Sequence, residues 1–192
     1  MPPFALPRSL SGYRPQDAGI LTHALIAMLV RELPRLTPVT LPERIHDLAG
    51  ALVDGDNANR RRVLLSTAAG HAATYLRRLA PTGWSLLGCE FDTGNGRVDL
   101  AWQHLDGRVF FDEVKTVNRP VGVLTPSWVD QAARYARGGK GHFGADFAGV
   151  RLLPIGSLHC AALVRADGTF SRLSPTSADP LASAEAVHGS DQ

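Results

Sequence analysis

The sequence predicts one α+β domain in which helices flank a mixed central sheet, with extra helices at the N-terminus. Two observations predict this class. Three helical segments are expected in the first half, and strand-like segments separated by glycine turns follow before a last helix and strand. The length of 192 residues suits one domain, and a hydrophobic content of 44% suffices for an ordinary core.

The N-terminal part is expected to hold an irregular arm and two helices. Residues 1–15 are rich in proline and show no periodicity. One helix is expected over 17–33, where the apolar spacing is helical and Pro34 ends it, and a second over 40–54. Because neither helix carries a chemical constellation, we expect residues 1–57 to pack on the core as structural elements.

A third helix, over 58–79, is expected to begin the core. Arg60, Arg61 and Arg62 stand at its start, where their charge opposes the helix dipole. Contact with nucleic-acid phosphates and a solvated face are the two interpretations of this cluster. In the middle of the helix, small residues surround His71, although a single helical histidine is more often structural.

The second half predicts an antiparallel meander of strands, then a helix and a closing hairpin. The helix should run from Ser127 to about Arg137, where Gly138-Gly139 ends it. The expected strands lie at 84–91, 97–103, 108–117 and 158–164, the last followed by a hairpin across Asp167-Gly168.

These elements divide the chain into three parts. The N-terminal segment covers 1–57, and the core covers 58–173. Residues 174–192 are rich in Ser, Ala, Pro and Asp without a pattern, so we expect a disordered tail there.

The register of the second and third strands decides whether two acidic residues share a face. Residues two apart on a strand point the same way, so Glu113 and Lys115 lie on one face. A two-residue turn would put Asp99 on the opposite face. A three-residue loop at 105–107 would pair Asp99 with Glu113, with Gly107 in the left-handed conformation that such loops need.

Two carboxylates on adjacent strands, beside an ammonium group, suit a hard divalent cation. Mg²⁺ takes oxygen ligands and keeps several waters, and an adjacent lysine can orient a metal-bound water and offset phosphate charge. Lys115 is one of only two lysines among 20 basic residues, which hints at a requirement for an ammonium group. The alternative is a solvated strand face, where acidic and basic residues often alternate.

The helix after the third strand adds two polar residues next to its apolar stripe. Gln131 and Tyr135 lie one helical turn apart. They could hydrogen-bond a phosphate or steady the carboxylates, or they could simply pack at the helix edge.

Together these motifs resemble the RecB-like exonuclease branch of the PD-(D/E)XK nuclease superfamily. The resemblance covers about residues 58–165 and implies a restriction-endonuclease-like αβββαβ core. It rests on the following residues: His71 on a helix, Gly96-Arg97-Val98-Asp99, Glu113-Val114-Lys115-Thr116, and Gln131 four residues before Tyr135.

The resemblance also implies a set of metal ligands. In such nucleases the residues that match Asp99 and Glu113 bind Mg²⁺ or Mn²⁺, and the backbone carbonyl that matches Val114 is commonly a further ligand. His71 matches the helical histidine that can bind the metal.

The remaining implied roles are catalytic. Lys115 would assist the nucleophilic water, while Gln131 and Tyr135 match the signature of the helix that follows the core strands. Glu90 is a candidate for an accessory acidic role. The two cysteines of the chain are too few for the iron–sulfur cluster of some relatives.

We therefore expect a cytoplasmic nuclease that acts on nucleic acid, with DNA favoured. The net charge of +2 means that any nucleic-acid surface is local. No apolar run is long enough for a membrane span, and a homodimer or a partner protein is possible. The alternatives are an RNA-cleaving enzyme on the same fold and a non-catalytic nucleic-acid-binding module.

Overall fold

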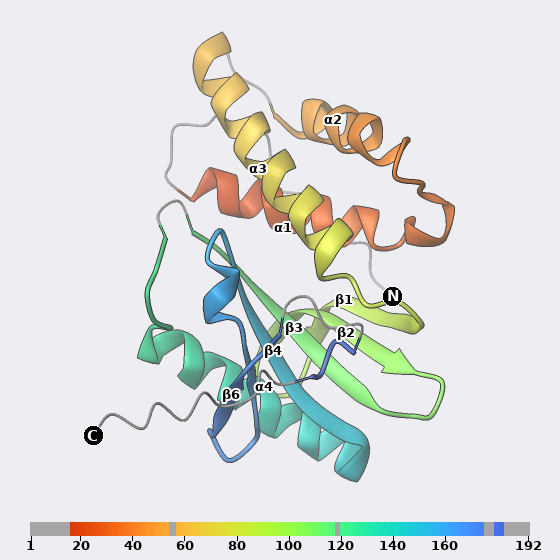
Figure 1. Cartoon of the computed structure of the whole chain (residues 1–192), viewed down its shortest axis with the longest axis vertical. Coiled ribbons are helices and arrows are strands. Elements are labelled where there is room, and N and C mark those ends of the chain that lie inside the picture. The colour runs from red at the N-terminus through yellow and green to blue at the C-terminus, as the bar shows by residue number, and fades with distance from the viewer. Residues whose placement is uncertain (1–15, 54–56, 118–119, 175–178, 183–192) are drawn as a thin grey trace, which may run out of the picture.

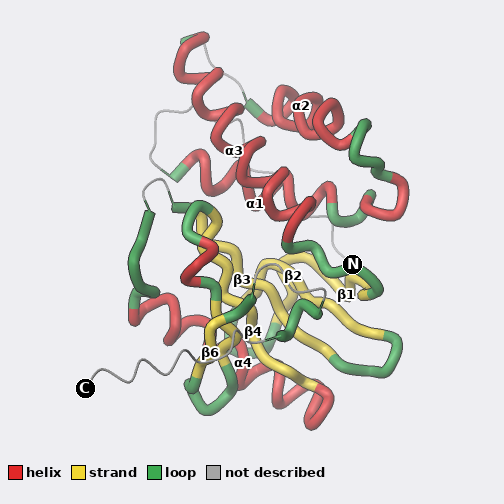
Figure 2. The backbone as a smooth tube through the Cα atoms, in the orientation of Figure 1, coloured by secondary structure: helices red, strands yellow, loops and turns green. Residues whose placement is uncertain are grey.

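The structure, a computed structural model, describes residues 16–53, 57–117, 120–174 and 179–182. It shows an α+β domain built on a mixed six-stranded sheet (Figure 1). In the tube view, helices α1, α2 and α3 lie on one side of the sheet and α4 lies on the other (Figure 2). The predicted fold class is confirmed at this level.

The N-terminal helical layer contains the three helices that the periodicity predicts. They are α1 (Asp17–Leu29), α2 (Leu41–Leu52) and α3 (Ala58–Arg78), with a short 3₁₀ turn at Leu33–Arg35. The side chain of Asn57 caps α3 by accepting a hydrogen bond from the Arg60 N–H at 3.0 Å. None of the helices in the described ranges is long and apolar enough to cross a membrane.

The strands follow one another across the sheet in chain order. Only β3 and β4 run parallel, and all other neighbours are antiparallel. The predicted meander and the hairpin across Asp167-Gly168 are therefore confirmed. The bounds are β1 (Trp84–Asp92), β2 (Arg97–His104), β3 (Val109–Thr116), β4 (Phe147–Ile155), β5 (Ala162–Val164) and β6 (Phe170–Arg172).

Strand β4 is the element that the sequence pattern misses. Eight of its nine residues are buried, so it lacks the alternation that marks a half-exposed strand. The strand expected over 158–164 is in fact a 3₁₀ turn at Leu158–Cys160 followed by the short β5. The predicted order αβββαβ still holds, because β4 is the strand that follows the last helix.

Helix α4 (Pro126–Phe143) also departs from the prediction, because it continues through Gly138 and Gly139. A Cβ on Gly138 would lie 2.2 Å from the Thr93 carbonyl oxygen, and one on Gly139 would lie 2.4 Å from the Phe147 ring. These glycines therefore allow the helix to approach the sheet closely and do not end it.

A buried ionic network joins α3 to strands β2, β3 and β4. The Asp112 carboxylate accepts hydrogen bonds from Arg151 Nε at 2.6 Å and Nη2 at 2.7 Å, from the Tyr75 hydroxyl at 2.5 Å and from Trp102 Nε1 at 3.1 Å. All four side chains are buried. Such complete pairing is what keeps a buried charge tolerable, so we assign this network a structural role.

Two expectations concern the ends of the chain. The arm expected over 1–15 lies outside the described residues. Of the tail expected over 174–192, the structure describes Ser174 and 179–182, where the Ser174 N–H donates to the Ala182 carbonyl at 3.2 Å.

Candidate active site

The register of β2 and β3 is the one that brings the two candidate acids together. The His104 N–H donates to the Arg108 carbonyl at 2.9 Å, which closes a three-residue loop over 105–107 whose final glycine has a φ of +96°. Leu100 pairs with Asp112, so one step further Asp99 faces Glu113. This confirms the three-residue loop and the register that it predicts.

The Asp99 carboxylate is held between α1 and β3. Its Oδ1 lies 2.8 Å from Nδ1 of His23, and its Oδ2 accepts a hydrogen bond from the Val114 N–H at 2.7 Å. Because both oxygens have a partner, the orientation of this carboxylate is fixed. Val114, expected as a backbone ligand, therefore lies directly beside it.

A chain of hydrogen bonds runs from β3 to α4 through the predicted polar residues. Lys115 Nζ donates to Glu113 Oε1 at 2.6 Å and to Gln131 Oε1 at 2.7 Å. Gln131 Nε2 in turn donates to the Tyr135 hydroxyl at 2.8 Å. The lysine ammonium is thus held between a carboxylate and an amide, and the four side chains form one connected group.

Burial and neighbouring charges shift the pKa values of the ionisable groups in this cluster. Burial, and then the nearby Asp99 charge, raise the pKa of Glu113 to about 7, against the opposing effect of Lys115. Burial lowers the pKa of His23, but the charge and hydrogen bond of Asp99 outweigh it, so the net pKa is raised. The two carboxylates therefore attract positive charge to this position.

His23 is the site residue that the sequence analysis misses. The imidazole expected here was that of His71 on α3, but α1 is the helix that contacts both β2 and β3. His71 has a buried Nδ1 without a hydrogen-bond partner, and burial alone lowers its pKa. The signal that could have found His23 is its position as a histidine inside the apolar stretch at 20–30.

Glu90, the candidate accessory acid, lies beside Asp99. The register of β1 with β2 sets the two residues opposite each other. Glu90 has a φ of +49°, which is uncommon for a residue other than glycine. It lines a hollow of about 10 Å³ with His23 and Asp99, roughly the room of one water molecule, and burial and the Asp99 charge raise its pKa.

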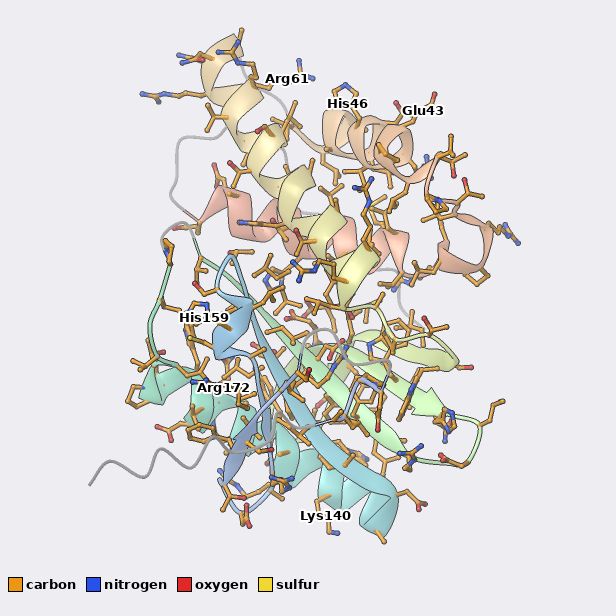
Figure 3. All side chains as sticks on the ribbon, in the orientation of Figure 1. Glu43, His46, Arg61, Lys140, His159 and Arg172 are labelled. Carbon is orange, nitrogen blue, oxygen red and sulfur yellow. The ribbon has the colours of Figure 1, made fainter. Side chains whose placement is uncertain are left out.

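The arginines at the start of α3 do not join this cluster. Arg60, Arg61 and Arg62 are exposed, and Figure 3 shows Arg61 at the end of α3 that is far from the sheet. The rise of an α-helix puts Arg61 about 21 Å from Tyr75, which touches the sheet. Any contact of these arginines with a nucleic acid would therefore be remote from the carboxylates.

The donor chemistry suits a hard divalent cation, but no closed cage of ligands is formed. Among the described residues, no group of three or more His, Cys, Asp or Glu side chains is arranged to hold a metal ion. Mg²⁺ is often held by only one or two carboxylates and otherwise by water and substrate oxygens. Asp99 and Glu113 fit that mode of binding.

Comparison with protein-family models, with curated protein sequences and with solved structures finds no match to this chain.

Proposed function

We propose that the chain is a metal-dependent nuclease that hydrolyses phosphodiester bonds, with DNA as the favoured substrate. We further propose that 58–173 is a restriction-endonuclease-like core of the RecB-like PD-(D/E)XK type. The observation that carries the proposal is the single cluster of Asp99, Glu113 and Lys115, built from two adjacent strands in one register. The order α3, β1, β2, β3, α4, β4 supports the fold assignment.

The proposed cofactor is Mg²⁺ or Mn²⁺. Asp99 and Glu113 would hold it, with the Val114 carbonyl as a further oxygen donor. A divalent cation bound there would polarise a phosphate oxygen and lower the pKa of a bound water. The raised pKa of Glu113 supports this assignment, because the charge of a cation would offset the repulsion between the two carboxylates.

Each side chain of the cluster then has a defined task. The Lys115 ammonium orients the attacking water and offsets negative charge on the phosphate. Gln131, itself held by Tyr135, fixes the position of that ammonium. His23 holds the Asp99 carboxylate in place, as outer partners of metal ligands commonly do.

The test is cleavage of labelled single- and double-stranded DNA and RNA, with Mn²⁺ and with a chelator in its place. We expect Mn²⁺-dependent cleavage of DNA by the wild-type chain and none by Glu113→Gln. Cleavage of RNA alone would favour the RNA-cleaving alternative. If no substrate is cleaved and calorimetry detects no Mn²⁺ binding, the non-catalytic binding module would replace this proposal.

A further inference from the structure

A second polar cavity lies at the C-terminal end of α3, away from the candidate active site. Its volume is about 160 Å³. Helix α3 contributes Arg77 and Arg78, and β4 contributes Arg151. Thr82 and Ser174 add hydroxyl groups to the lining. The proposed nuclease chemistry uses none of these residues.

Arg151 is a buried residue whose guanidinium group lines this cavity. The residue is only 4% exposed. Its Nε and Nη2 are bonded to Asp112, and Nη2 also donates to the Leu79 carbonyl at 2.9 Å. Nη1 makes no hydrogen bond within the described part of the chain.

The surroundings of Nη1 can be inferred from which fully buried side-chain atoms lack a hydrogen-bond partner. Among the described residues, the only fully buried side-chain nitrogen or oxygen without a partner is Nδ1 of His71. Since Arg151 lines the cavity, we infer that its Nη1 faces the space inside it. From there its N–H groups can donate to a bound ligand.

The charge of the lining favours an anion. Asp112 balances the charge of Arg151, but Arg77 and Arg78 add two further positive charges. Among the described residues, no acidic side chain lines the cavity, and neither Arg77 nor Arg78 forms an ion pair. An excess of positive charge around a small cavity raises the local concentration of an oppositely charged ligand.

We propose that this cavity binds a phosphate group, either as inorganic phosphate or as the phosphomonoester of a nucleotide. Guanidinium groups match the oxygen geometry of phosphate, and charge-assisted hydrogen bonds to it are strong. The volume suits a small oxyanion. A bound phosphate would join the end of α3 to β4, so it would stabilise the folded chain.

The experiment measures thermal unfolding of the metal-free full-length chain in potassium phosphate and in potassium chloride of equal ionic strength. We expect phosphate to raise the Tm by several degrees with a saturable dependence on concentration. The Arg77→Gln/Arg78→Gln double variant should need at least tenfold more phosphate for the same shift, because each lost charged hydrogen bond weakens binding. Arg35→Gln, an exposed arginine of the 3₁₀ turn, is the matched control and should behave like the wild type.

A repeat with a nucleoside 5′-monophosphate distinguishes the two sources of the phosphate group. A midpoint at least tenfold below that of inorganic phosphate would assign the nucleotide ester, and equal midpoints would assign the free ion. An equal Tm rise in chloride, or an unchanged midpoint in the double variant, would overturn the proposal. Since the assay uses no metal and no turnover, its result is independent of the proposed nuclease activity.

Discussion

Asp112 and Glu113 are neighbours on β3, both are buried, and their surroundings are opposite. Asp112 accepts four hydrogen bonds from three side chains, one of which is the Arg151 guanidinium. Glu113 has a single ammonium partner and a second carboxylate close by, and its pKa rises to about 7. Adjacent residues of one strand thus carry a fully paired acid on the α3 side and an incompletely paired acid near α4.

The two acids on β3 therefore have different roles in the molecule. A buried charge that is completely paired becomes costly only when one of its partners is removed. A carboxylate with a shifted pKa is typical of a functional position, because its charge remains available to a ligand.

The largest expected effect is on folding. Asp112→Ala should lower the free energy of unfolding by about 3–5 kcal/mol, because it leaves the Arg151 charge buried and unpaired. Urea denaturation of the wild type and the variant measures it. A loss below about 1 kcal/mol would mean that the network contributes little and that the two acids differ less than we argue.

Glu113→Gln should show the reverse pattern. Removing this negative charge relieves its repulsion with Asp99, so we expect unchanged or higher stability. Cleavage should fall by about 100-fold or more, because a metal-bound charge is worth several kcal/mol in the transition state. Single-turnover cleavage and urea denaturation on the same preparation test both halves, and retained cleavage would contradict the assignment.

Lys115→Ala and Lys115→Arg should each lose most of the turnover while the fold and Mn²⁺ binding persist. The arginine keeps the charge, but its wider planar fork cannot replace a compact ammonium between Glu113 and Gln131. The measurement is single-turnover cleavage alongside Mn²⁺ titration. Wild-type cleavage by the alanine variant would show that the ammonium has no catalytic part.

The variants His23→Ala and His71→Ala can be compared directly, because each removes one imidazole. His23→Ala should reduce cleavage by about 10- to 100-fold, the usual cost of losing an outer partner of a metal ligand. His71→Ala removes an imidazole that has no hydrogen bond at its buried nitrogen, so cleavage should remain near the wild-type rate. If the two variants lose equal amounts of cleavage, the assignment of His23 in place of His71 to the site would be contradicted.

The smallest effect concerns pH in the absence of metal. The pKa of Glu113 is about 7 in the folded chain and 4.5 ordinarily, so between these values the folded state binds more protons than the unfolded state. Stability should therefore fall by about 1–3 kcal/mol as the pH rises from 5 to 8. The raised pKa of His23 acts in the same direction above pH 6.5. Denaturation at several pH values measures this fall, and Glu113→Gln should flatten it.

Local sequence signals predict much of the site. The glycine at the end of the loop 105–107 determines the register of β2 and β3, so the pairing of Asp99 with Glu113 follows from turn chemistry. Helical spacing likewise predicts that Gln131 and Tyr135 face the same way, and the structure links them by a hydrogen bond.

The features that escape prediction depend on tertiary packing. His23 reaches Asp99 because α1 docks across the sheet, and no local pattern encodes which helix does so. Gly138 and Gly139 look like a helix end until the close approach of Thr93 and Phe147 is known. Strand β4 is buried on both faces, so it has no alternation to recognise.

The contact between His23 and Asp99 spans 76 positions of the chain. Closing so long a loop costs more entropy than forming the β2–β3 hairpin, so the hairpin can assemble its two carboxylates before α1 docks. A folding intermediate would then hold Asp99 and Glu113 without the imidazole that orients one of them. A fragment trimmed to 58–173 would lack His23, so it would keep Asp99 and Glu113 without the imidazole that contacts one of them.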